Sequence, residues 1–208
     1  MKNTKLIGVG AFGKVYRTKN RIDPSMEVAI KVLDKIKLQK KYKALDIIMA
    51  EIKILNTLDH PNIVKYFETY DDSRYIYLVM EYVKGSDLFE CIKNKKRFSE
   101  KKLAEYMRSL FSAIQHCHSN GVIHRDIKIE NIMITSDDSV RLIDFGLSKI
   151  KTDDENFYEV AGTIDYMAPE VLAGNCDMSA DIWSLGVVLY ILASGYYPFS
   201  GKVTSQSP

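Results

Sequence analysis

The sequence predicts an α+β protein built in two parts, a smaller sheet-rich part followed by a mostly helical one. Short segments of alternating apolar and polar residues, interrupted by one helical pattern, come first in the chain. Longer segments with apolar residues at helical spacing follow them. A switch of pattern across a short glycine-containing link indicates a division between two units. We therefore expect one part at residues 1–83 and the other at residues 84–208.

The first part is predicted to be a sheet with one helix. Its first two strands flank a glycine-rich segment, and the second flank continues as strand, whereas a dinucleotide-binding fold would need a helix there. Residues 43–58 carry apolar side chains at helical spacing and predict an amphipathic helix. The strands are expected on both sides of the glycines in residues 4–20, and at residues 27–33, 63–70 and 75–83.

The second part is predicted to be helical. Ser86 or Asp87 can cap a helix at residues 88–95, and residues 99–121 have the start and stop signals of a long helix. The longest apolar run, at residues 182–194, is too short to span a bilayer and is expected to form a core helix. We therefore expect neither a membrane span nor a secretory signal.

Charge and cysteine usage argue against several classes of protein. The formal net charge of +2 is too small to indicate a nucleic-acid partner. The widely spaced Cys91, Cys117 and Cys176 predict free thiols in a reducing compartment, which is either the cytoplasm alone or the cytoplasm and the nucleus.

His116 and His118 lack metal-ligand spacing, because nearby helical positions point in different directions. The oligomeric state cannot be predicted from these observations.

Two polar segments interrupt apolar runs in the second part. They are HRDIKIEN at residues 124–131 and DFG at residues 144–146. A solvated turn before a buried strand would explain the first segment taken alone. The order of all the motifs is more specific, because GVGAFGKV at 8–15, VAIK at 28–31 and Glu51 precede these segments and APE at 168–170 follows them.

That ordered set resembles the signature of eukaryotic protein kinase catalytic domains of the serine/threonine type, over residues 4–200. The segments YLVMEYVKGSDLFE and VAGTIDYMAPEVLAG are similar to the calcium/calmodulin-dependent and calcium-dependent kinase group. The resemblance implies a two-lobed fold, with a small antiparallel-sheet N-lobe containing one main helix and a mostly helical C-lobe.

The resemblance implies catalytic roles for four side chains. Lys31 would pair with the α- and β-phosphates of ATP, and Glu51 would hold Lys31 through an ion pair. Asp126 would accept the proton of the attacking hydroxyl, and Lys128 would contact the γ-phosphate. His124 is expected to have a packing role instead. Its expected neighbours in an apolar spine are Leu55, Tyr66 and Phe145, with Asp181 as the anchor.

The resemblance also implies a site for ATP and Mg²⁺ between the lobes. Glycine allows backbone amides to approach phosphates closely. The residues expected to cover the phosphates are Gly8, Val9, Gly10 and Gly13. The residues expected around the adenine are Val15, Ala29, Met80, Glu81, Val83 and Met133, with Glu81 and Val83 using backbone groups. The residues expected to bind Mg²⁺ are Asn131 and Asp144.

Asp87 and Glu130 stand where related kinases keep acidic groups, so we expect a protein substrate with basic residues near its phosphosite. Arg125 usually binds a phosphate on the activation segment of such kinases. Glu159 occupies the usual phosphosite here, which predicts activity without phosphorylation at that position. Thr152 and Tyr158 are the alternative phosphosites.

The end of the sequence departs from the family pattern. After YYPFSGKVTSQSP the chain lacks the helices that usually complete the lower lobe, so its C-lobe is expected to be incomplete. We therefore expect Glu170 to be a buried carboxylate without its usual arginine partner. The apolar helix at residues 182–194 is expected to expose one face.

Two functional hypotheses stay open at this point. The first is an ATP-dependent serine/threonine protein kinase. The second is a kinase-like nucleotide-binding or regulatory module with impaired catalysis. A small-molecule kinase is less consistent with GTIDYMAPE, which resembles a peptide-docking segment. No EF-hand spacing occurs, so any calcium control would come from elsewhere.

Overall fold

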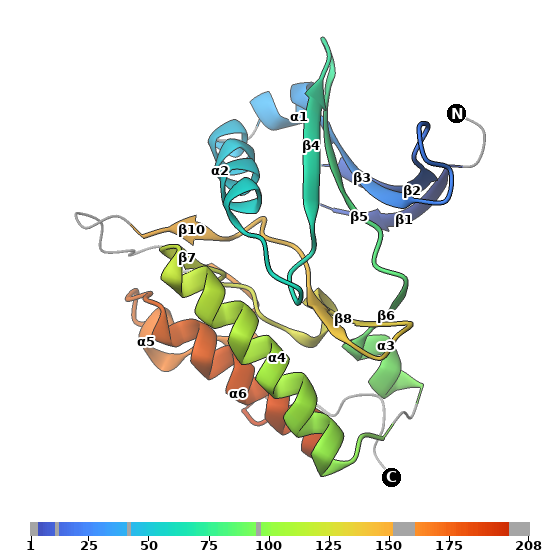
Figure 1. Ribbon diagram of the computed structural model, residues 1–208. Coiled ribbons are helices and arrows are strands. Elements are labelled where there is room, and N and C mark those ends of the chain that lie inside the picture. The colour runs from blue at the N-terminus through green and yellow to red at the C-terminus, as the bar shows by residue number, and fades with distance from the viewer. Residues whose placement is uncertain (1–3, 11–12, 41–42, 95–96, 152–160, 200–208) are drawn as a thin grey trace.

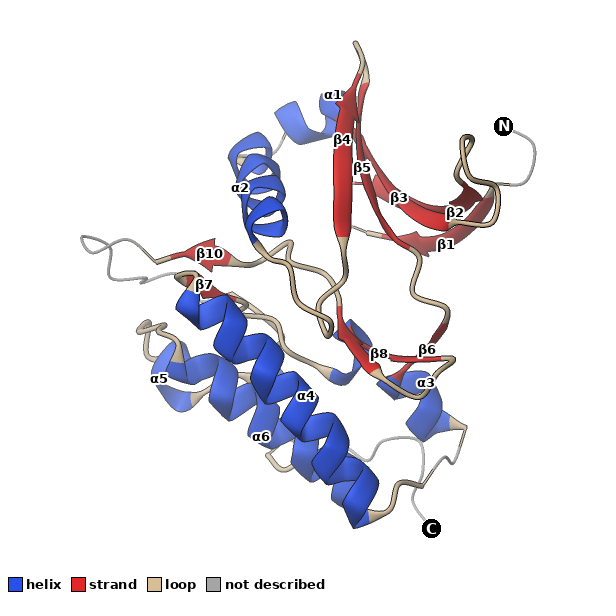
Figure 2. Cartoon of the chain, in the orientation of Figure 1, coloured by secondary structure: helices blue, strands red, loops and turns tan. Residues whose placement is uncertain are grey.

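A computed structural model describes residues 4–10, 13–40, 43–94, 97–151 and 161–199 of the chain. A twisted sheet with two helices lies at one end of the molecule, and a helical part with two small sheets lies at the other (Figures 1 and 2). The predicted α+β class is confirmed. Within the described residues, no helix is both long and apolar enough to cross a bilayer.

The five-stranded antiparallel sheet holds the N-terminal part of the site. Its strands are β1 (Lys5–Val9), β2 (Gly13–Lys19), β3 (Glu27–Asp34), β4 (Tyr66–Asp71) and β5 (Tyr75–Glu81), in the order β1-β2-β3-β5-β4. The central position of β3 places Lys31 opposite Val15 on one side and Leu78 on the other. Strand β4 begins later than predicted, because Ile63 and Val64 bridge to Leu142 in the other part instead.

Two helices accompany this sheet, α1 (Lys35–Gln39) and α2 (Ala44–Thr57). Helix α2 is the predicted amphipathic helix, and its buried side carries Ile48, Glu51 and Leu55 at spacings of three and four residues. Glu51 therefore points inward with the apolar residues, although it is charged. Helix α1 was not predicted, and Asp34 caps its first turn by accepting the Ile36 and Lys37 amides.

The C-terminal part packs two long helices against each other (Figure 1). Its helices are α3 (Leu88–Lys93), α4 (Glu100–Ser119), α5 (Pro169–Leu172) and α6 (Ser179–Ser194), with single turns η1 (Ile129–Asn131) and η2 (Ile164–Tyr166). Its short strands are β6 (Gly85–Asp87), β7 (Val122–Ile123), β8 (Ile132–Thr135), β9 (Val140–Leu142) and β10 (Lys149–Ile150). Asp87 caps α3 and Ser99 caps α4, which confirms both predicted helix starts.

The chain changes sheets between Glu81 and Gly85. Strand β5 ends in the large sheet at Glu81, and β6 begins at Gly85 in a small sheet with β8 and β9. The predicted boundary between residues 83 and 84 falls within this crossing and stays a prediction.

Helix α6 has one buried and one exposed side, both of them apolar. Leu185 and Val188 are fully buried, whereas Trp183 and Tyr190 on the other side are 37% and 49% exposed. The predicted uncovered face is therefore confirmed. The expectation of a buried Glu170 carboxylate is wrong, because Glu170 is only half-buried and accepts a hydrogen bond from Ser179 Oγ at 3.3 Å.

Candidate active site

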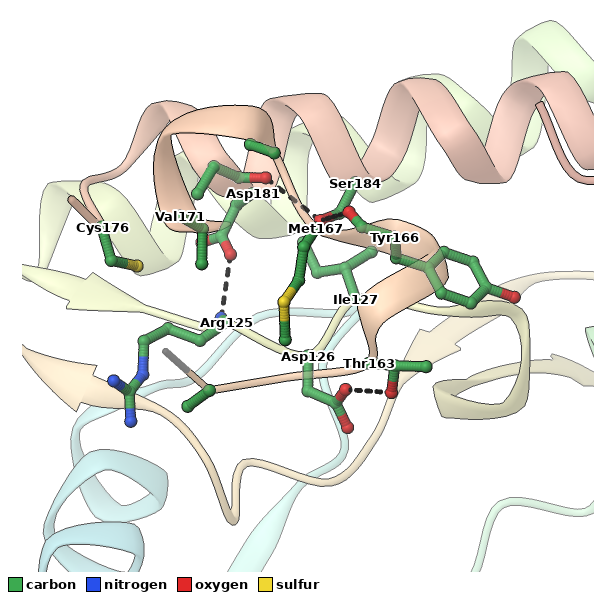
Figure 3. A pocket seen from close by; sticks show the side chains of 13 residues that line it. Arg125, Asp126, Ile127, Thr163, Tyr166, Met167, Val171, Cys176, Asp181 and Ser184 are labelled. Carbon is green, nitrogen blue, oxygen red and sulfur yellow. Dashed lines mark hydrogen bonds between the residues drawn. The ribbon is translucent and has the colours of Figure 1, made fainter. Parts of the chain in front are cut away.

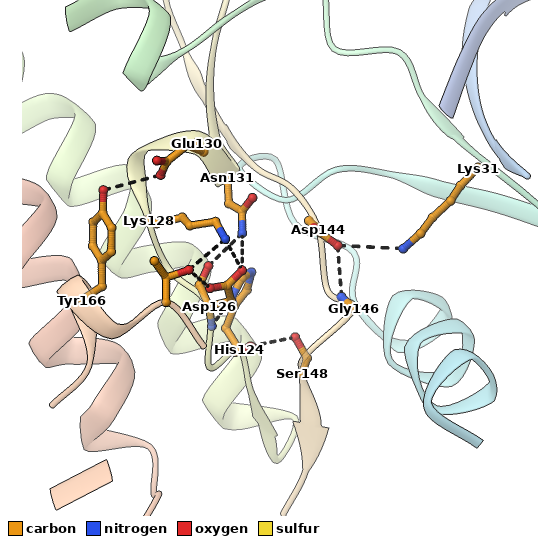
Figure 4. Close-up of polar contacts among 11 residues, drawn as sticks. Lys31, His124, Asp126, Lys128, Glu130, Asn131, Asp144, Gly146, Ser148 and Tyr166 are labelled. Carbon is orange, nitrogen blue, oxygen red and sulfur yellow. Dashed lines mark hydrogen bonds and ion pairs between the residues drawn. The ribbon is translucent and has the colours of Figure 1, made fainter. Parts of the chain in front are cut away.

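Lys31 of β3 connects the large sheet to α2 and to the DFG segment. Its Nζ donates to Glu51 Oε1 at 2.5 Å and lies 3.9 Å from Asp144 Oδ1. Figure 4 shows Lys31 pointing toward Asp144 from the sheet side. The predicted Lys31–Glu51 ion pair is therefore present in the structure, and it brings the amine to the DFG carboxylate.

The environment of Lys31 keeps its amine charged. Burial alone would lower the pKa of Lys31, but the charges of Glu51 and Asp144 and the hydrogen bond to Glu51 outweigh it, so the pKa is raised. A permanent cation at this position suits the binding of an anionic group.

Asp126, the aspartate of HRD, lies at the centre of a closed polar cluster. The buried carboxylate accepts hydrogen bonds from Lys128 Nζ at 2.7 Å and Asn131 Nδ2 at 3.0 Å on Oδ2. Its Oδ1 accepts the Thr163 hydroxyl at 2.8 Å (Figure 3). Lys128 also donates to Thr163 Oγ1 at 3.0 Å, so four side chains hold one another in place.

Thr163 was not identified from the sequence, and the backbone explains how it reaches Asp126. Gly162 has a φ of +119°, and a Cβ there would lie 2.4 Å from the carbonyl oxygen of Arg125. Only glycine allows the two segments to approach so closely. The available signal was the position of Thr163 next to this glycine in GTIDYMAPE.

Asp181 of α6 anchors the loop that carries Asp126. Its buried carboxylate accepts the backbone amides of His124 and Arg125, each at 2.9 Å, and contacts His118 Nε2 at 2.8 Å. Arg125 has a φ of +65°, which is uncommon for a side-chain-bearing residue. The hydrogen bonds to Asp181 offset this backbone cost and fix the direction of the loop.

His124 packs against Phe145, and its Nδ1 accepts the backbone amide of Asp126 at 3.3 Å. The two rings meet edge to face with centroids 4.7 Å apart, and both side chains are fully buried. Burial lowers the pKa of His124, so the ring is neutral. The packing contact with Phe145 and the anchoring by Asp181 agree with the expectation for His124. Leu55 and Tyr66 belong to the same apolar cluster.

The residues expected around a nucleotide lie on strands of two sheets and in the crossing after β5: Val15 on β2, Ala29 on β3, Met80 and Glu81 on β5, Val83 in the crossing and Met133 on β8. Ala29 lies directly opposite Met80 in the β3–β5 pair, and Val83 is buried just beyond β5. The Glu81 amide donates to the Lys65 carbonyl at 2.7 Å, so only the Glu81 carbonyl, as an acceptor, would remain at this residue for the expected contact with adenine. Met133 lies opposite Asp87 in the small sheet.

The glycine-rich segment forms the connection between β1 and β2. Gly8 and Val9 belong to β1 and Gly13 begins β2, while the Gly10 amide donates to the Gly13 carbonyl at 2.9 Å. Ala11 and Phe12 lie outside the described residues.

The two expected acidic residues for substrate binding lie on different elements. Asp87 Oδ1 accepts the Glu90 amide at 2.7 Å, so its carboxylate also serves as the α3 cap. Glu130 of η1 accepts the Tyr166 hydroxyl at the long distance of 3.5 Å (Figure 4). Tyr166 packs edge to face on Tyr197.

Comparison with known proteins identifies the family. The profile described as "Protein kinase domain" matches residues 1–207. The chain belongs to the protein kinase family. It is 41% identical to calcium-dependent protein kinase 5 of Plasmodium berghei (strain Anka) over 199 residues, which cover 94% of this chain and 34% of that protein.

Two further relatives come from other lineages. The kinase domain is 42% identical over 198 residues to calcium/calmodulin-dependent protein kinase type 1 of Macrobrachium nipponense, covering 93% of this chain and 56% of that protein. It is 42% identical over 203 residues to CBL-interacting protein kinase 10 of Oryza sativa subsp. japonica, covering 95% and 44%. The chain spans between about a third and just over half of the length of these relatives. The predicted resemblance to the calcium-dependent kinase group is confirmed.

The oxygen ligands of the kinase domain fit Mg²⁺. The Asp144 carboxylate is 53% exposed, and both hydrogen bonds of the Asn131 amide use Nδ2, which leaves its oxygen as an acceptor. Mg²⁺ in nucleotide sites takes one or two carboxylates together with substrate phosphates. In the described ranges no cluster of three His, Cys, Asp or Glu residues could hold a metal ion.

The predictions about the activation segment fall outside the described residues. Glu159, Thr152 and Tyr158 lie in residues 152–160, so the expected activity without phosphorylation stays a prediction. Arg125, the expected partner of Glu159, donates from Nε to the Leu147 carbonyl at 2.7 Å.

Proposed function

We propose that this kinase domain is the catalytic part of an ATP-dependent protein serine/threonine kinase. The proposal depends chiefly on the Asp126 cluster. A buried carboxylate, a lysine two residues later and a hydroxyl from another segment are held within 3.0 Å of one another. A kinase-like module that only binds nucleotide would not need a base and a phosphate contact in this arrangement.

The chain's own residues would divide the work as follows. Lys31, held by Glu51, would bind the α- and β-phosphates, and Asp126 would orient the substrate hydroxyl and accept its proton. The hydroxyl oxygen forms a bond to the γ-phosphorus while the bond to the β,γ-bridging oxygen breaks, and ADP leaves. Lys128 would compensate negative charge on the transferring group. Mg²⁺, bound by Asp144 and Asn131, would neutralise phosphate charge.

Phosphate transfer and nucleotide binding should be measured side by side on this chain and its Asp126→Asn variant. The expected result is transfer by the parent chain and a rate lower by about 10²–10⁴ in the variant, with nucleotide affinity retained. Nucleotide binding without Asp126-dependent transfer would favour the regulatory module instead.

We also propose that the substrate carries basic residues near its phosphosite. The acidic side chains of Asp87 and Glu130 support this proposal, since Glu130 lies in the HRDIKIEN segment itself and Asp87 ends β6, which contacts η1 of that segment. The test is an Asp87→Asn/Glu130→Gln variant, because asparagine can still cap α3 while the charge is lost. We expect KM for an arginine-containing peptide to rise about tenfold, as for loss of a charge pair. An Asp59→Asn variant is the control, and unchanged peptide preference would contradict the proposal.

A reducing location such as the cytoplasm is proposed for this chain. The three buried cysteines form no disulfide within the described part of the chain, and burial raises the pKa of Cys117 to about 12, which makes its thiol unreactive. Imaging of a tagged protein would test the location.

A further inference from the structure

A second concave surface lies outside the active site, at the N-terminal end of α4. It has a volume of about 450 Å³. The segment before α4, the first turns of α4 and the turn from β8 to β9 line this open surface. Its lining residues are Arg97, Phe98, Ser99, Lys101, Lys102, Glu105, Tyr106 and Asp138. We call this surface the α4 groove.

The acidic residues of the α4 groove are already paired. Lys102 Nζ lies 2.6 Å from Asp138 Oδ2 and 3.1 Å from Glu105 Oε2. Tyr106 donates its hydroxyl to Asp138 Oδ1 at 2.5 Å. Lys102 therefore bridges both carboxylates and leaves one net negative charge on these three charged side chains. Its ammonium also lies 4.9 Å from the centre of the Tyr106 ring.

Two cationic residues on the rim of the groove, Arg97 and Lys101, have no carboxylate partner among the described residues. Both residues are exposed. They flank the first turn of α4, which also carries Glu100 and where the helix dipole adds partial positive charge. The lining of the groove holds three cations against two carboxylates, so it favours an anionic group.

The groove also offers an apolar contact. Phe98 is half-buried and packs edge to face on the buried Tyr106, with centroids 5.7 Å apart. A partly exposed aromatic ring beside exposed cations is typical of a surface that binds an apolar anchor next to charged groups.

We propose that the α4 groove binds an acidic segment of the protein substrate, with an apolar side chain against Phe98 and carboxylates beside Arg97 and Lys101. The proposal rests on the proposed function, because its occupant is a kinase substrate. The geometry of the C-lobe supports a substrate as the occupant. Strand β8 runs from Asn131 of the active site to the turn that carries Asp138, so the groove begins roughly 15 Å from Asn131 at about 3.3 Å per residue.

An extended linker of roughly five to ten residues could therefore join the phosphosite to the docked segment. Docking of this kind raises the local concentration of the phosphosite without contacting the reacting atoms. It should lower KM and leave kcat unchanged.

The test uses a fluorescein-labelled peptide of glutamates with interspersed leucines, and the same sequence fused behind a substrate peptide. Binding is measured by fluorescence anisotropy on the parent chain and on Arg97→Glu/Lys101→Glu. The matched control is Lys19→Glu/Arg21→Glu, which makes the same charge change on exposed residues far along the sheet. We expect the groove variant to weaken binding about tenfold and the control to leave it unchanged. The fused substrate should show a KM increase of the same size in the groove variant, with kcat retained.

Peptide binding does not require phosphate transfer, so the anisotropy measurement would reveal the docking site even in an inactive chain. Failure of the proposed function would instead appear in the phosphate-transfer assay. Three results would overturn the proposal. They are equal weakening in the control, undiminished affinity for a glutamate peptide without leucines, and a dimer of the chain that dissociates in the groove variant. The last result would make the groove a contact between two copies.

Discussion

At the scale of single residues, Thr163 links Asp126 and Lys128, the proposed base and the proposed phosphate contact. One hydroxyl donates to Asp126 Oδ1 and accepts from Lys128 Nζ, so it fixes both side chains at once. Hydrogen bonds to charged groups contribute about 1.5–3 kcal/mol each. Removing this hydroxyl should therefore disturb catalysis more than nucleotide binding.

We expect Thr163→Val to lower kcat roughly ten- to a hundredfold, because each 1.4 kcal/mol corresponds to a factor of ten. KM for ATP should change little. Thr163→Ser keeps the hydroxyl and should retain most of the activity. Steady-state kinetics on the three proteins would check this, and equal activity of the valine and serine variants would show that the hydroxyl does not position Asp126.

His124 provides a prediction about pH at the same scale. Its folded-state pKa is lowered because the ring is buried, so below the ordinary value of about 6.5 the unfolded chain binds a proton that the folded chain does not. Its contribution to stability is complete above that pH and is lost as the pH falls, at up to about 1.4 kcal/mol per pH unit.

His124→Phe keeps an aromatic ring against Phe145 and cannot titrate. Urea unfolding at several pH values below neutrality should show a shallower loss of stability in this variant than in the parent chain. His60, whose pKa is also lowered by burial, is present in both proteins and cancels in the comparison. Parallel slopes would contradict the assignment of this effect to His124.

Gly85 matters at the scale of elements, because it allows β6 to pair with β8. A Cβ at this position would lie 1.8 Å from the Ile134 carbonyl oxygen. The β6–β8 pair ends at Asp87, which caps α3, so the position of the helix depends on this close approach. We expect Gly85→Ala to lower the free energy of unfolding by about 1–3 kcal/mol, the usual cost of forcing extra atoms into packed structure. Ser86→Ala, at an exposed position of the same strand, should leave the free energy of unfolding nearly unchanged. If both variants lowered it equally in urea unfolding, the close approach of β6 to β8 at Gly85 would not be the cause.

The same scale shows what the sequence could predict. The periodic segments α2, α4 and α6 and the strands of the large sheet were predicted, because their side-chain spacing repeats over enough residues to be recognised. The strands β7 and β10 have two residues each and pair across the chain, so no local pattern indicates them. Helix α1 was missed because its five residues are too few to show a period.

The candidate site was predicted to a similar degree. The Lys31–Glu51 pair could be anticipated from the order of motifs, and it is present at hydrogen-bond distance. The contribution of Thr163 could not be anticipated from the order of motifs, because it depends on a close approach of two backbone segments at Gly162. Contacts that depend on long-range backbone approach leave little trace in a linear sequence.

At the scale of the whole molecule, backbone hydrogen bonds connect the segment between α2 and β4 to strand β9 of the C-lobe. The Val64 amide donates to Leu142 and the Leu142 amide donates to Asn62, at 2.9 and 2.8 Å. Asn62 Nδ2 also donates to the Val140 carbonyl at 2.9 Å. The segment after α2 is therefore held against β9, which leads directly into the DFG segment, so the position of Glu51 and that of Asp144 are coupled through the backbone.

The exposed side of α6 is the other feature of the molecule as a whole. Ile182 and Leu189, two turns apart on this helix, are 45% and 40% exposed, and Trp183 stacks on Phe199 beside them. A contiguous apolar surface of this kind promotes association. We expect the chain to self-associate through this side of α6, and covering two half-exposed aliphatic side chains contributes about 2 kcal/mol.

Ile182→Lys/Leu189→Lys should therefore weaken self-association roughly thirtyfold, with little change in the unfolding midpoint, since neither side chain lies in the core. Ile22→Lys/Ile36→Lys is the matched control, because these residues are exposed apolar side chains on the other lobe. Sedimentation velocity over a range of concentrations measures the association constant of each protein. If the control pair reduced association as much as the α6 pair, added charge rather than loss of the apolar surface would be the cause. The α6 surface would then have no part in the contact between copies.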